Sequence, residues 1–197
     1  PLRGQRQRVI RDSHCTIKQA GCTADVVVSE TNSLIYACRA EKPGFVTIHG
    51  IKRDLLLGTL PAKRAAEALA PLQACFAQIR SAKNVFESTL ANGNAMLHPA
   101  PSLLNASLIE SEHAWRYYVD GITPSIGAFV EKMDQERLAI AKVLDVPAIS
   151  VLDWFREAYG VSAKTVSEAA KTNPAYQAIA GQKQIRTRYT MEEIPKS

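Results

Sequence analysis

The hydrophobic pattern of the sequence changes its period near Pro61, and this change limits the folds that the chain can adopt. Three apolar runs precede it, at residues 24–30, 44–51 and 55–61. Their β-branched residues are typical of strands, and the first run is typical of a strand buried on both faces. The stretch 33–40 is ambiguous. After Pro61 an apolar stripe recurs at steps of four, three, four and three, which predicts a helix through Ala65, Leu69, Leu72, Phe76 and Ile79.

Helical signals dominate the rest of the chain. We expect one helix to begin near Ser102, with Leu103, Leu104 and Leu108 on one face. Thr123 and Pro124 predict the N-cap and first residue of another helix. The predicted buried face of that helix comprises Ile126, Phe129, Val130 and Met133.

Two shorter helices are predicted further on. Ser150 and Asp153 form a capping box at the start of one, and Gly160 marks its exit. Residues 162–171 predict the other, and the chain is irregular and polar from Asn173 onward.

Strands in the first third and helices in the remainder indicate an α/β domain followed by an all-α domain. The boundary between the two is expected between Pro61 and about Asn92. A doubly wound sheet needs several βαβ units, so the α/β part is too short to be whole. The sequence contains no GxGxxG motif. If the protein binds a dinucleotide, the fingerprint is expected upstream of Pro1, and we expect the chain to be a piece of a longer protein.

Composition excludes several classes of protein. No apolar run reaches the roughly 18 residues that a membrane span requires, and no secretory signal is visible, so we expect a cytoplasmic protein. Cys15, Cys22, Cys38 and Cys75 lack CxxC spacing, and we interpret them as reduced, partly buried thiols rather than two disulfides. The four histidines show no metal-binding spacing, so no metal is expected.

Charge does not indicate a nucleic-acid partner. The net charge is +5, but the basic residues are dispersed apart from two short groups without interleaved aromatics. A solvated basic surface is the plain interpretation, and attraction of small anionic substrates is the alternative.

His98 is the leading candidate for chemistry. It follows Asn92 and Asn94, precedes Pro99 and lies beside a helix start. A histidine titrates near neutral pH, and a tight turn can orient its ring for proton transfer. The alternative is a buried structural histidine with a satisfied hydrogen bond.

Two other stretches contain candidate residues. Arg188 and Glu193 lie in a charged segment before a proline; an arginine can hold a carboxylate, and a carboxylate can orient an imidazole. The alternative there is a surface loop with weak ion pairs. Glu30 and Thr31 follow the first apolar strand, at the end where ligands bind in open α/β sheets. Capping of a helix by Thr31 or Ser33 is the alternative.

These stretches resemble the opine dehydrogenases, the octopine/nopaline dehydrogenase family. The matching segments include "ADVVVSETNSLIYACRA", "NGNAMLHPAPSLLNASLIE", "YYVDGITPSIGAFVEKMDQERLAIAKVL", "DWFREAYG", "NPAYQAI" and "TRYTMEEIP", in the family's order over nearly the whole chain. The resemblance implies that residues 1–90 form the C-terminal portion of a Rossmann domain and residues 91–197 a helical domain that is itself incomplete, with substrates in the cleft. It implies reductive condensation of an amino acid with a 2-oxo acid such as pyruvate, reversibly, with NAD or NADP as cofactor.

The resemblance also implies roles for the candidate residues. His98 matches the family's catalytic histidine, in an "N-x-N-x-x-x-H-P" setting. Glu193 stands where the family has an aspartate partner, so this chain carries one additional methylene at that position. Arg188 matches an arginine that holds substrate, Thr31 is expected to contact the 2-oxo acid and Glu30 the amino-acid side chain. No cofactor-binding residue is assigned within this chain.

Other functions remain open at this point. One is a two-domain reductase that acts on a 2-oxo acid without an amine, and another is a non-catalytic helical binding module. The expected partners are small-molecule substrates, with neither nucleic acid nor membrane. The oligomeric state is open, with a homodimer among the alternatives.

Overall fold

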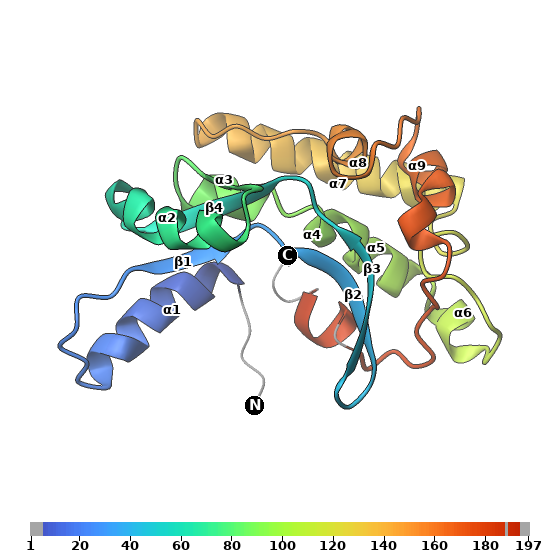
Figure 1. Ribbon diagram of the computed structural model, residues 1–197. Helices are drawn as coiled ribbons and strands as arrows, with labels where there is room; N and C mark the ends of the chain where they lie inside the picture. The colour runs from blue at the N-terminus through green and yellow to red at the C-terminus, as the bar shows by residue number, and fades with distance from the viewer. Residues whose placement is uncertain (1–5, 188, 194–197) are drawn as a thin grey trace.

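A short mixed sheet with flanking helices forms the first part of the chain (Figure 1). The structure is a computed structural model that describes residues 6–187 and 189–193. Its three-stranded sheet has the order β1-β4-β5, in which β1 pairs antiparallel and β5 parallel with β4. Its elements are α1 (Arg6–Gln19), β1 (Val28–Thr31), β4 (Leu55–Leu60), η1 (Ala62–Arg64), α2 (Ala65–Cys75), β5 (Ile79–Ser81) and α3 (Val85–Leu90).

The strand prediction for 55–61 is confirmed, but the prediction that 24–30 is buried on both faces is wrong. β4 is the buried central strand, and Leu55, Leu57 and Ile79 form its core with residues of α2. β1 has four residues, all half-buried, and it has one strand neighbour among the described residues. A run of β-branched residues therefore predicted the strand correctly, but its burial depends on which segments cover it.

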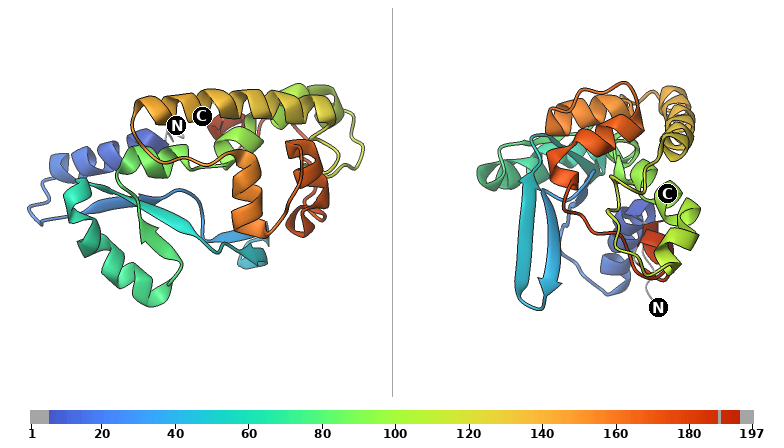
Figure 2. Two further views of the ribbon diagram at one scale, coloured as in Figure 1. Left: turned by 90° about the horizontal axis from the view of Figure 1, so that it is seen from above. Right: turned by 90° about the vertical axis from the view of Figure 1, so that its right-hand side faces the viewer.

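The strand predicted at 44–51 is confirmed and belongs to a separate hairpin. β2 (Tyr36–Lys42) and β3 (Phe45–Ile51) pair antiparallel, and the hairpin projects away from the helices (Figure 2, right). β2 begins inside the stretch 33–40, whose structure the sequence left ambiguous, and ends two residues beyond it at Lys42. Several apolar side chains of the hairpin are exposed, among them Phe45, Val46, Ile48 and Ile51.

Helices make up the second part of the chain. They are α4 (Asn94–Leu97), α5 (Pro99–Leu104), α6 (Ala106–Glu110), α7 (Pro124–Val143), α8 (Val151–Tyr159) and α9 (Val166–Thr172), followed by the turns η2 (Pro174–Tyr176) and η3 (Tyr189–Glu193). The long helix α7 lies across α3, α4, α5 and α9, as Figure 2 (left) shows from above. None of the described helices is long and apolar enough to cross a membrane.

Helix boundaries that depend on capping residues are confirmed. Thr123 Oγ1 accepts from the Ile126 amide, and Pro124 opens α7. Ser150 Oγ accepts from the Asp153 amide at the start of α8, and Gly160 ends that helix in the left-handed conformation. Residues 162–171 also contain the predicted short helix, α9.

Other helix predictions are corrected. The helix after Pro61 ends at Cys75, and Ile79 lies in β5 instead of on its stripe. The helix expected near Ser102 begins at Pro99 and is interrupted at Asn105, whose side-chain amide donates to the carbonyls of Pro101 and Gly121. Phe129, predicted on a buried face, is exposed, and Leu103 and Leu104 of the helix near Ser102 are exposed as well.

The cysteines also differ from the prediction in one respect. All four are free, but they are exposed rather than partly buried.

A buried ion pair joins the two parts of the chain. Arg137 and Asp134 lie one turn apart in α7, and the guanidinium Nη2 is 2.6 Å from the carboxylate Oδ1. Arg137 also donates to the carbonyls of Leu90 and Ile149, and Asp134 accepts from the Val151 amide. One ion pair thus fixes the end of α3, the long helix α7 and the start of α8.

Candidate functional site around His98

His98 lies at the junction of two short helices. Its amide donates to the Asn94 carbonyl and closes α4, while its carbonyl accepts from the Ser102 amide and opens α5. Asn92 Oδ1 caps the start of this region by accepting from the Asn94 amide at 3.2 Å. Pro99 stands at the first position of α5, where its missing N–H group costs nothing. The turn thus holds the backbone of a histidine that is only 3% exposed.

Two aromatic residues fix the imidazole ring. The Tyr118 hydroxyl lies 2.9 Å from His98 Nε2, within hydrogen-bond distance. The Tyr189 ring stacks on the imidazole, with centroids 4.2 Å apart and planes inclined by 24°. Stacking fixes the plane of the imidazole, and the hydrogen bond fixes its rotation within that plane.

Further tyrosines support these contacts. Tyr117 Oη donates to the His98 carbonyl over 2.9 Å and also bonds to Ser102 Oγ. Tyr176 stacks on Tyr118 with centroids 3.8 Å apart. Burial raises the pKa of the Tyr176 hydroxyl well above its usual range, because the charged phenolate is disfavoured away from water. We call Tyr117, Tyr118, Tyr176 and Tyr189 the aromatic cluster.

The segment after α9 is held against this cluster by backbone hydrogen bonds. Gly181 donates to the Trp115 carbonyl over 2.7 Å, and Tyr117 donates to the Ile179 carbonyl over 2.8 Å. A Cβ atom at Gly181 would lie 2.0 Å from the Trp115 indole, so a larger residue cannot fit without movement. This close approach leads the chain back to α5, where η3 packs.

Two predicted site residues belong to this returning segment. Arg188 lies outside the described residues. Glu193 is described by its backbone alone, as the last residue of η3, about one turn after Tyr189. The structure therefore brings the backbone of the Glu193 segment beside His98. The prediction that the Glu193 carboxylate is the partner of His98 stays a prediction.

Glu30 and Thr31 lie in another part of the structure. Glu30 Oε1 accepts from Thr89 Oγ1 in α3 over 3.3 Å, and Thr31 Oγ1 donates to the Ser33 carbonyl over 2.7 Å. These two side-chain hydrogen bonds run to α3 and to the turn after β1, whereas the Nε2 hydrogen bond of His98 runs to Tyr118 of the aromatic cluster. A pocket role for Glu30 and Thr31 stays a prediction.

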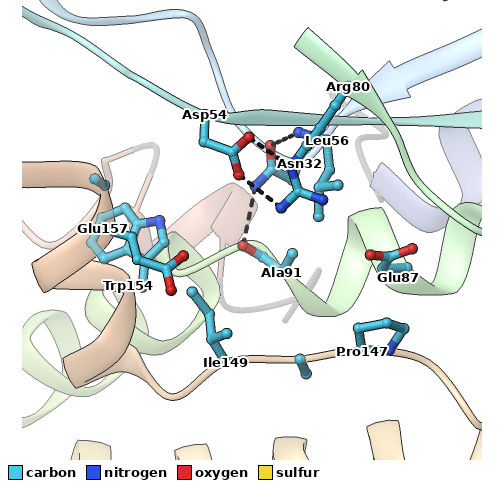
Figure 3. A pocket seen from close by; sticks show the side chains of 12 residues that line it. Asn32, Asp54, Leu56, Arg80, Glu87, Ala91, Pro147, Ile149, Trp154 and Glu157 are labelled. Carbon is cyan, nitrogen blue, oxygen red and sulfur yellow. Dashed lines mark hydrogen bonds and ion pairs between the residues drawn. The ribbon is translucent and has the colours of Figure 1, made fainter. Parts of the chain in front are cut away.

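A separate pocket lies between the sheet and α8 (Figure 3). Asn32 joins its walls, since its side chain accepts from the Leu56 amide and donates to the Ala91 carbonyl. Arg80 and Asp54 form a two-pronged ion pair at one side, and Trp154 faces it from α8. His98 does not line this pocket. The contacts of Asn32 fix the start of the segment that leads to His98.

No residue of this chain is assigned to the nicotinamide cofactor. Pyrophosphate recognition needs a glycine-rich turn that leads into a helix N-terminus, and the sequence contains no GxGxxG motif. The parallel β4–β5 pair is followed by the six-residue helix α3, whose N-cap is the Asn84 side chain.

Sequence reasoning missed the partners of His98. Tyr117 and Tyr118 were not singled out, although "WRYYVDG" groups three aromatic residues immediately before the cap of α7. The ion pair of Asp134 and Arg137 was missed as well, because charged residues on a helix are usually solvated. Sequence spacing alone does not reveal which charged residues of a helix face the core.

Solved structures of octopine dehydrogenase have the same fold. The complex with NADH and agmatine matches with a TM-score of 0.60 and 18% identity over 87% of this chain and 49% of that chain. The complex with NADH and L-arginine matches with a TM-score of 0.59, at the same identity and coverage. The predicted fold class, the end of a Rossmann domain followed by helices, is therefore confirmed.

Sequence comparison defines the family. A family model described as NAD/NADP octopine/nopaline dehydrogenase, alpha-helical domain, matches residues 81–197. An opine dehydrogenase from Arthrobacter sp. (strain 1C) is 44% identical over 170 residues, which cover 86% of this chain and 47% of the relative. The chain belongs to the NAD/NADP octopine/nopaline dehydrogenase family and spans about half the length of that relative. The resemblance inferred from the sequence is thus confirmed, and the division between residues 90 and 91 stays a prediction.

Proposed function

We propose that this chain is part of an opine dehydrogenase that condenses an amino acid with a 2-oxo acid and reduces the product, reversibly. The observation that carries the proposal is the setting of His98. Its imidazole is buried, bonded to Tyr118 and stacked on Tyr189, one turn before Glu193. Catalysis requires an imidazole held in one orientation, and this arrangement supplies it.

The proposed chemistry requires proton transfer to and from the oxygen and nitrogen atoms that are bound to the reacting carbon. The amine nitrogen attacks the keto carbon while protonated His98 donates a proton to the carbonyl oxygen. His98, now neutral, takes a proton from the nitrogen of this adduct and passes it to the hydroxyl oxygen, which leaves as water and gives the protonated imine. A reduced nicotinamide supplies the hydride that converts this imine to the secondary amine. His98 acts at the oxygen and then at the nitrogen, and its protonated form polarises the carbonyl.

Other residues receive roles in this proposal. The Glu193 carboxylate orients the imidazole and stabilises its protonated form. Arg188 holds a substrate carboxylate through two parallel hydrogen bonds. Thr31 contacts the 2-oxo acid, and Glu30 contacts the side chain of the amino acid. The link from Glu30 to Thr89 supports this assignment, because α3 leads directly into the His98 segment.

The substrates are proposed by analogy with relatives. Octopine dehydrogenase has been solved with L-arginine, agmatine or pyruvate together with NADH. We therefore propose an amino acid and a 2-oxo acid such as pyruvate as substrates, and NAD or NADP as cofactor. Exposed free thiols fit a reducing compartment such as the cytoplasm.

The test is a cofactor-oxidation assay with the full-length protein. Absorbance of NADH and of NADPH is followed with pyruvate, in the presence and absence of a mixture of amino acids. The proposal predicts oxidation only when both substrates are present. Oxidation with pyruvate alone would instead indicate a 2-oxo acid reductase. Absence of oxidation by a folded full-length protein would favour a non-catalytic helical module.

A further inference from the structure

Tyr117 and Tyr118 are neighbours in the chain, and both direct their hydroxyl groups at His98. Tyr118 Oη lies 2.9 Å from the imidazole Nε2, whereas Tyr117 Oη lies 2.9 Å from the backbone carbonyl oxygen. Both tyrosines are buried. We propose that Tyr118 is the positioning residue that holds the His98 imidazole in one orientation before and after proton transfer, a role that rests on the proposed function.

A hydroxyl group suits this role because it can donate and accept a hydrogen bond. When Nε2 carries a proton, it donates a hydrogen bond to the Tyr118 oxygen. When Nε2 is bare, the same hydroxyl turns and donates. A carboxylate accepts only, and an ammonium group donates only. Tyr118 can therefore keep its contact with His98 before and after the imidazole changes protonation state.

The Tyr118 ring is itself fixed by packing. Tyr176 stacks on one face at 3.8 Å, with planes inclined by 15°, and Tyr117 meets it edge-on at 4.9 Å. A hydroxyl on a ring held this way loses little further freedom when it bonds to His98. Stacking on Tyr189 does not by itself restrain rotation of the imidazole within its own plane. The hydrogen bond between Tyr118 and Nε2 restrains that rotation.

The two neighbouring tyrosines provide a matched pair of variants. Tyr118→Phe keeps the ring and its stacking but removes the hydroxyl on Nε2. Tyr117→Phe removes the hydroxyl on the backbone carbonyl and leaves Nε2 untouched. Each is made in the full-length protein, whose histidine rings are labelled with ¹⁵N. The His98 nitrogen signals are identified by their loss in His98→Gln, and kcat and KM are measured with pyruvate and the amino acid.

The expected results separate the two variants. In Tyr118→Phe the Nε2 signal shifts and kcat falls about tenfold, the scale of one neutral hydrogen bond. KM changes less than about twofold, since the hydroxyl acts through His98 and makes no substrate contact in the proposal. In Tyr117→Phe the Nε2 signal stays at the wild-type position.

Three results would overturn the proposal: an unshifted Nε2 signal in Tyr118→Phe, an unchanged kcat, or the same Nε2 shift in both variants. Failure of the proposed function is distinguishable from these. If the wild-type protein does not condense the substrates while Tyr118→Phe alone shifts Nε2, the enzyme assignment is wrong and the structural hold of Tyr118 on His98 is supported.

Discussion

Removal of the Asp134 carboxylate is expected to destabilise the protein far more than removal of an exposed carboxylate. Asp134 accepts two hydrogen bonds from Arg137 on Oδ1 and one from the Val151 amide on Oδ2. The side chains of this ion pair are 7% and 8% exposed. Asp134→Ala would leave a buried guanidinium without its counter-ion and a buried amide without its acceptor.

The expected loss follows from that desolvation. Breaking a buried ion pair by removing one partner costs about 3–5 kcal/mol, because the remaining charge stays out of water. That is a large share of the roughly 5–15 kcal/mol by which folded proteins are stable. Removing Arg137 as well takes away the stranded charge. The double variant is therefore expected to lose about 1–3 kcal/mol less than the sum of the single variants.

Urea unfolding of the full-length protein measures these free energies, and hydrogen exchange at the Val151 amide reports the local effect. Asp54→Ala is the matched control. Asp54 makes the same two-pronged contact with Arg80, but both side chains are more than 40% exposed. We expect the control to lose at most about 1 kcal/mol. An Asp134→Ala variant within 1 kcal/mol of wild type would refute the reasoning about this ion pair.

Three further predictions concern the His98 region. His98→Ala in the full-length enzyme should lower kcat by at least about a hundredfold, and a loss under threefold in steady-state assays would return His98 to a structural role. Gly181→Ala should cost about 1–3 kcal/mol or more in urea unfolding, because its Cβ would overlap the Trp115 indole; wild-type stability would contradict this. Burial raises the pKa of Tyr176 in the folded state, so stability should fall as pH rises above about 10, where the unfolded chain ionises first. Unfolding titrations at pH 8–11 check this, and Tyr176→Phe should show a shallower decline.

Features that depend on a few adjacent residues could be predicted from the sequence. The starts of α7 and α8 follow from Thr123 with Pro124 and from Ser150 with Asp153, because capping is a local interaction. His98 was found in the same way, from a short polar turn before prolines.

Features that depend on distant segments could not be predicted. Leu103 and Leu104 fit an apolar helical face, yet they are exposed, and α5 ends at Asn105, whose side chain bonds to the distant Gly121 carbonyl. The partners of His98 come from residues 20 and 91 positions later in the chain, and no spacing rule connects them. Charge pattern likewise did not reveal that Asp134 and Arg137 are buried.

The most direct test of the central claim is the identity of the product. Full-length protein is incubated with reduced cofactor, ¹³C-labelled pyruvate and an ¹⁵N-labelled amino acid, and the products are measured by mass spectrometry. The proposed function predicts a single secondary amine that carries both labels, formed at least about a hundredfold more slowly by His98→Ala. A ¹³C-labelled 2-hydroxy acid without ¹⁵N, formed at the same rate with or without the amino acid, would contradict it.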